Sequence, residues 1–62
     1  MTPDQEVHTL LTAQHFGGQF MRLLATAGIA ADPDNRRRLF AAFPDLQNFY
    51  GPRTMFYSED LG

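Results

Sequence analysis

Three of the four prolines in this chain stand where a helix can begin. Proline suits the first helical position because its backbone nitrogen has no hydrogen that needs a partner there. Pro3 follows Thr2, which forms the Thr-x-x-Gln pattern of a capping box with Gln5. Pro33 follows Asp32, which is a good N-cap residue. These start signals predict an all-α protein.

The first helical region has an ambiguous middle at Gly17-Gly18. The apolar residues before the glycines point more than about 90° away from those after them on a helix. One interpretation is a single long helix, continuous or kinked, whose glycines let another helix approach closely. The other is two shorter helices, at 4–16 and 19–27. We favour the single helix, because no proline interrupts this region.

Gly28 marks the predicted end of this region. With Gly28 as the first residue beyond the helix, Leu24 and Ile29 occupy the two positions whose side chains touch in a Schellman cap. We therefore expect the helix to end just before Gly28.

Two shorter helices and a different kind of segment follow. A second helix is predicted over 33–42, since Pro44 disfavours helical geometry in the residue before it. A third is predicted over 44–50, where Gly51 ends it. Residues 53–62 contain an apolar run without helical spacing, which predicts an extended C-terminal tail that folds back over the helices. The predicted fold is one small all-α domain over residues 1–62, with one long or kinked helix, two short helices and this tail.

A chain of 62 residues without cysteine has few means of becoming stable. Its core alone supplies about 3–5 kcal/mol, and no disulfide adds to that. The chain must therefore pack unusually well, associate with itself or bind a partner. We expect a homodimer.

Aromatic residues are concentrated in the second half of the chain: Phe40, Phe43, Phe49, Tyr50, Phe56 and Tyr57. Most of them should form the core, but a domain this small leaves some for an interface, where Tyr, Phe, Met and Arg are enriched. Met55, Phe56 and Tyr57 are the candidates for partner binding, because they lie outside the helices. The alternative, which we favour, is that these three pack over Phe40 and Phe43.

The remaining candidates for partner binding are basic: Arg36, Arg37, Arg38 and Arg53. Asp32 and Asp34 stand four residues before Arg36 and Arg38, so that two ion pairs are expected along the helix. Adjacent side chains on a helix diverge by about 100°, so the three consecutive arginines spread around it. A solvated face is the simpler interpretation, and binding to a phosphate or an acidic protein surface is the other. A net charge of -2 argues against nucleic acid as the partner.

No group of residues indicates catalysis, a cofactor or a metal. The absence of cysteine removes thiol chemistry and thiolate metal sites. His8 and His15 are seven residues apart, whereas a helix that binds a metal usually places two histidines four apart. Ser58 is the only serine, and acidic residues follow it. Because no catalytic group is visible, we expect a non-enzymatic protein. No apolar run is long enough for a transmembrane helix, and the first residues lack the pattern of a signal peptide. We therefore expect the protein to be cytoplasmic and not to enter membranes.

The second half of the chain also resembles a group of known sequences. The stretches that carry the resemblance are Ala31 to Arg36, Ala41 to Leu46, Tyr50-Gly51-Pro52 and Phe56-Tyr57. Residues 31–62 are similar to short uncharacterised proteins of bacteriophages and prophages of GC-rich proteobacteria. The resemblance implies a small phage-related protein without assigned activity, and such proteins often bind host or virion proteins.

These observations predict a non-enzymatic protein-interaction module, such as a phage-encoded regulator or accessory protein. A nucleic-acid-associated protein that uses the arginines is one alternative. A small structural subunit of a homo-oligomer is the other.

Overall fold

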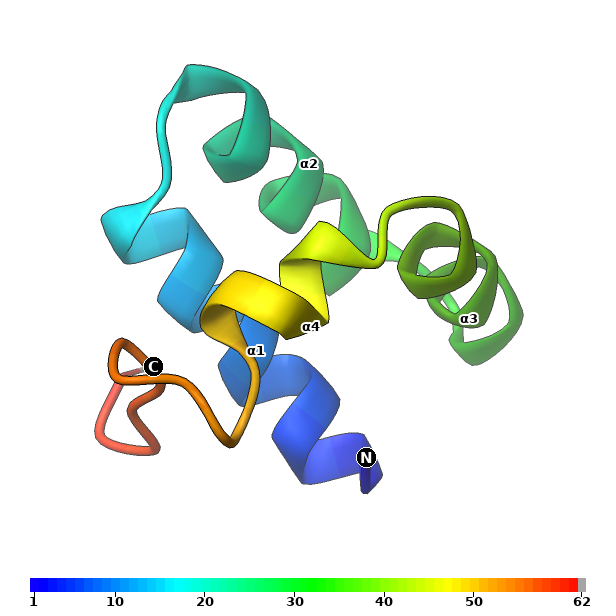
Figure 1. Ribbon diagram of the computed structural model, residues 1–62. Coiled ribbons are helices and arrows are strands. Elements are labelled where there is room, and N and C mark those ends of the chain that lie inside the picture. Colours follow the sequence, from blue (N-terminus) through cyan, green and yellow to red (C-terminus); the bar gives the residue numbers. More distant parts are fainter. Residues whose placement is uncertain (62) are drawn as a thin grey trace.

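The computed structural model describes residues 1–61, which form four helices (Figure 1). The helices are α1 (Pro3–Phe16), α2 (Gln19–Ala30), α3 (Pro33–Ala42) and α4 (Asp45–Tyr50). Within these residues there is no strand, so the predicted all-α class is confirmed. The radius of gyration is 9.9 Å, close to the value of about 10.5 Å that is usual for a compact chain of this length. None of the described helices is long and apolar enough to cross a membrane.

The first helical region is two helices, so the predicted single long or kinked helix is wrong. Gly17 and Gly18 both have extended backbone, with ψ of 160° and -176°, and the chain changes direction between them. A Cβ atom on Gly17 would lie 2.5 Å from the Ala13 carbonyl oxygen and 2.9 Å from Met21 Cβ. The turn is therefore so tight that residue 17 has no room for a side chain. The two helices then pack against each other, and this contact favours the break.

The predicted Schellman cap at Gly28 is also wrong. α2 continues through Gly28 to Ala30, and Ala31 is its C-cap residue. Gly28 is buried against α1, where a Cβ atom would lie 2.8 Å from Leu10 Cδ2. Glycine at this position lets α1 and α2 approach closely, a role that was expected for Gly17-Gly18.

The predicted helix starts are confirmed by their hydrogen bonds. The Gln5 amide donates to Thr2 Oγ1 at 3.1 Å, and the Thr2 amide donates to Gln5 Oε1 at 2.9 Å. The Asn35 amide donates to Asp32 Oδ1 at 2.8 Å, and α3 has the predicted bounds. The last helix begins one residue later than expected, with Pro44 as its N-cap residue.

The core is small and lies where α1, α2 and α4 meet. Leu10, Ala13, Ala25 and Leu46 are its fully buried apolar residues. Two buried threonines line the same side of α1, and Thr12 Oγ1 donates to the His8 carbonyl oxygen at 2.6 Å. Helix α3 contributes no buried residue, and it lies at the side of the molecule against α2 (Figure 1). Most large apolar side chains are therefore only half-buried or exposed.

The C-terminal segment forms successive turns instead of the predicted extended tail. It contacts α1 and α4: the Phe56 ring centroid lies 5.3 Å from that of Phe16 and 6.1 Å from that of Tyr50. The Ser58 amide also donates to Thr12 Oγ1 at 3.3 Å. The aromatic contacts of Phe56 are thus with these rings, and the expected packing over Phe40 and Phe43 is wrong. Gly62, the last residue of the predicted tail, lies outside the described residues.

Candidate functional site

The Arg36 side chain caps the C-terminal end of α2. Its Nε donates to the Gly28 carbonyl oxygen at 3.0 Å, and its Nη2 donates to that of Ile29 at 3.2 Å. The last carbonyl groups of a helix have no partner within it and carry partial negative charge, so a guanidinium is well suited to them. The expected ion pair with Asp32 does not form among the described residues. Arg36 therefore has a structural role.

Arg37 and Arg38 lie on the exposed side of α3 and share one carboxylate. Their Nη2 atoms lie 2.9 Å and 3.8 Å from the oxygens of Asp34, so the expected pair of Arg38 with Asp34 is present. All three side chains are mostly exposed, and ion pairs of this kind contribute about 0–1 kcal/mol. The three consecutive arginines therefore do not form one patch. Their spacing on the helix predicted that they would spread around it.

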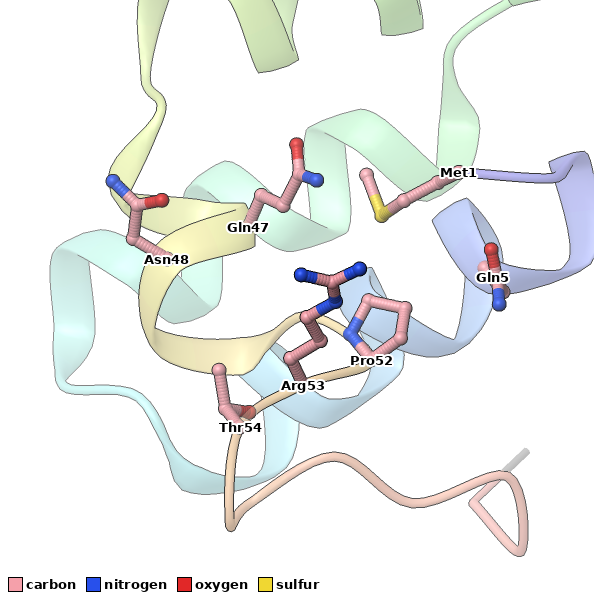
Figure 2. Close-up of a pocket in the computed structure, with 7 residues that line it drawn as sticks. All are labelled: Met1, Gln5, Gln47, Asn48, Pro52, Arg53 and Thr54. Atoms are coloured by element: carbon pink, nitrogen blue, oxygen red, sulfur yellow. The ribbon is translucent and has the colours of Figure 1, made fainter.

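Arg53 lies in a pocket with a volume of ≈ 490 Å³ between the start of α1, α4 and the turn after α4. Figure 2 shows its guanidinium in the middle of the labelled side chains, next to Pro52 and with Gln47 and Gln5 on either side. Asn48 and the Met1 side chain complete this part of the wall. Among the described residues that line the pocket, Arg53 has the only charged side chain. No carboxylate of residues 1–61 lies within ion-pair distance of it.

An apolar patch lies on α2 and at the end of α3. Phe20 and Leu23 are 61% and 62% exposed, and Phe43 is 38% exposed. The ring centroids of Phe20 and Phe43 lie 5.8 Å apart in an edge-to-face arrangement. We call these three residues the Phe20 patch. It presents large apolar side chains to solvent, which is the usual composition of a protein-binding surface.

A second group of aromatic rings joins α1, the C-terminal turns and α4. Phe56 lies between Phe16 and Tyr50, and Phe49 contacts Tyr50 with ring centroids 6.4 Å apart. Phe16, Phe49 and Phe56 keep 50%, 55% and 44% of their surface exposed. These rings hold the C-terminal turns against the helices, and they leave further apolar surface in contact with water.

The other predicted partner-binding residues of the C-terminal segment, Met55, Phe56 and Tyr57, have different environments. Met55 is 91% exposed, whereas Phe56 packs against other rings. Tyr57 is half-buried, and its hydroxyl donates to Glu59 Oε2 at 2.9 Å. Partial burial raises the pKa of Tyr57 above its usual value of 10.0, and the hydrogen bond and negative charge of Glu59 raise it further.

The two histidines occupy separate environments on α1. The Nδ1 of His8 lies 2.8 Å from the Asp4 carbonyl oxygen, and the His15 ring contacts Phe16 edge to face. Residues 1–61 contain no group of three or more histidine or acidic side chains that could hold a metal ion.

Most residues of the pocket and of the Phe20 patch were not predicted from the sequence. Phe20 and Leu23 belong to an apolar set that also includes Met21 and Leu24, and this set spans about 160° of the helix. One neighbouring helix cannot cover an arc that wide, which was the available signal that some of these side chains stay exposed. The glutamines of the pocket carried no such signal, because α1 and α4 bring them together only in the folded chain.

No family model, no curated protein and no solved structure matches this chain.

Proposed function

We propose that this chain is a small, non-enzymatic protein-interaction module that binds its partner through the Phe20 patch. The observation that carries the proposal is the exposure of Phe20 and Leu23, at 61% and 62%, in a chain that fully buries only four apolar residues among those described. The resemblance of residues 31–62 to small phage and prophage proteins supports a role as a phage-encoded regulator or accessory protein in the cytoplasm.

The energetics of burial favour this surface. Covering one large apolar side chain contributes about 1.5–3 kcal/mol when it is fully exposed beforehand. Phe20, Leu23 and Phe43 are partly exposed, so a partner gains a fraction of this from each of them. Neighbouring aromatic and aliphatic side chains at the centre of an interface commonly carry most of its binding energy. Nucleic acid is not the proposed partner, because Arg36 is bonded to main-chain carbonyls and Arg37 to Asp34.

The test is affinity capture with matched variants. The double variant Phe20→Ser, Leu23→Ser removes the centre of the patch without touching a fully buried residue. Phe49→Ser removes a similarly exposed phenylalanine from α4 and serves as the control. We expect one stoichiometric partner to be retained by the parent chain and by the control but not by the double variant. Retention of the same proteins by all three chains would contradict the proposal.

Self-association is the second candidate, and the small core favours it. Only Leu10, Ala13, Ala25 and Leu46 are fully buried apolar residues in residues 1–61, so a second copy that covers the Phe20 patch would add substantially to the stability. A dimer mass by analytical ultracentrifugation, lost in the Phe20→Ser, Leu23→Ser variant, would support it. A monomer mass with a melting temperature independent of concentration would exclude it.

A further inference from the structure

The pocket around Arg53 is independent of the Phe20 patch and shares no residue with it. Its volume of ≈ 490 Å³ lies in the range of pockets that hold small organic groups. The start of α1, α4 and the turn after α4 each supply part of its wall, so the folded chain creates a space that no single segment contains (Figure 2).

The lining offers more hydrogen-bond donors than acceptors. The guanidinium of Arg53 carries five N–H donors and no acceptor, and none of the described side chains accepts a hydrogen bond from it. The carboxamide of Gln5 is already fixed, because its Oε1 accepts from the Thr2 amide at 2.9 Å in the capping box. Its NH₂ group therefore remains as a donor. Gln47 and Asn48 add a donor and an acceptor each.

This chemistry matches an anion with a flat pair of oxygens. A guanidinium binds a carboxylate through two parallel hydrogen bonds, and the charge makes these bonds stronger than neutral ones. The pocket has one positive side chain in a chain of net charge -2, which suits a single negative charge better than the double charge of a phosphate. The carboxamide of Gln47 can pair with an amide next to the carboxylate.

We infer that the Arg53 pocket binds a carboxylate that is adjacent to an amide group. Such a group occurs in small N-acylated amino acids and at the carboxyl terminus of a peptide. Arg53 holds the carboxylate, and the NH₂ group of Gln5 is a further donor among the lining side chains. This site does not depend on the proposed binding through the Phe20 patch.

The experiment is an NMR titration of the ¹⁵N-labelled chain with N-acetylglycylglycine, and with its C-terminal amide as the control ligand. We expect saturable shifts of the Arg53 Nε–H and of the Gln5 and Gln47 side-chain amides with the acid only. Comparison of N-acetylglycine with an acetylated pentapeptide then shows which kind of molecule supplies the carboxylate. Tighter binding of the pentapeptide would identify a peptide terminus as the ligand, and equal binding would identify a small acid.

Three variants test the residue that carries the inference. Arg53→Gln should weaken binding of the acid by at least about tenfold. Arg53→Lys keeps the charge but not the paired geometry, so its affinity for the acid should lie between those of the parent chain and Arg53→Gln. Arg22→Gln, which removes an exposed arginine of α2, should bind like the parent chain. The ¹H–¹⁵N spectrum of each variant shows directly whether the fold is kept. Equal shifts with acid and amide, equal binding by Arg53→Gln and Arg22→Gln, or tighter binding of inorganic phosphate would each overturn the inference.

Discussion

The contact between Leu10 and Gly28 permits a direct test of how α1 and α2 pack. An alanine Cβ at position 28 would lie 2.8 Å from Leu10 Cδ2 and 3.1 Å from Leu10 Cδ1. Leu10 is fully buried, so its methyl groups have little room to move away. Gly28→Ala gains about 1 kcal/mol of helix propensity but loses about 1–3 kcal/mol through overpacking. We expect a net loss of about 1 kcal/mol in the free energy of unfolding.

Removal of the Leu10 methyl groups should reverse the sign of this effect. Leu10→Ala alone costs about 2–5 kcal/mol, because it leaves a cavity in the core. In that background the new methyl group at position 28 has space, so Gly28→Ala should recover about 1 kcal/mol. The double-mutant cycle therefore predicts a coupling of about 2 kcal/mol between the two positions, within the range for residues in contact.

Urea unfolding followed by circular dichroism measures all four chains, with sucrose added because Leu10→Ala removes most of the stability of so small a domain. Gly18→Ala is the control, since no atom lies within 4 Å of the position that its new methyl group would occupy, and its effect should be the same in both backgrounds. A coupling near zero at Gly28 would refute the close approach of α1 and α2.

Three further predictions concern the cap of α3, the C-terminal turns and the pKa of Tyr57. Asp32→Ala should lower the free energy of unfolding by about 0.5–2 kcal/mol, because it removes the bond from the Asn35 amide; an unchanged thermal melt would contradict that cap. Truncation after Pro52 removes the ring contacts and the hydrogen bond that join the last turns to α1 and α4, so helicity and melting temperature should both fall; a fragment with a full parental melt would show that these contacts add no stability. The pKa of Tyr57 is raised in the folded chain, so its contribution to stability is present below pH 10.0 and is lost as the pH rises through the folded pKa. Glu59→Gln should lower the midpoint of the Tyr57 titration, followed by NMR of ¹³C-labelled tyrosine, and an unchanged midpoint would exclude the influence of that carboxylate.

Features that depend on neighbouring residues were predictable from the sequence. Thr2 and Gln5 form their capping box, and Asp32 caps α3, because each bond spans only three residues. The all-α class followed from the same local signals. Pro44 and Gly51 likewise bound α4 to within one residue of the expected range.

Features that depend on distant residues were not predictable. The glycines at 17 and 28 both sit in helical sequence, and only the packing of α2 on α1 decides that the first forms a turn and the second a close contact. Arg36 shows the same limit: its spacing from Asp32 favoured an ion pair, but the end of α2 offers carbonyl groups that only the folded chain brings near.

The candidate sites were predictable only in part. Arg53 was a candidate for partner binding, and it supplies the charged side chain of the pocket. Phe20 and Leu23 stand at helical spacing in the sequence, but no described helix covers their side of α2. Sequence periodicity gives the direction of a side chain on its own helix, and it does not tell which neighbouring helix lies on that side.

The proposed function depends most directly on the exposure of the Phe20 patch in the free chain. A soluble paramagnetic agent, added to a dilute sample with labelled leucine methyl groups, measures that exposure for each leucine. We expect strong broadening of Leu23, which is 62% exposed, and almost none for the buried Leu10 and Leu46. Protection of Leu23 equal to that of Leu10 and Leu46 would contradict the proposed function.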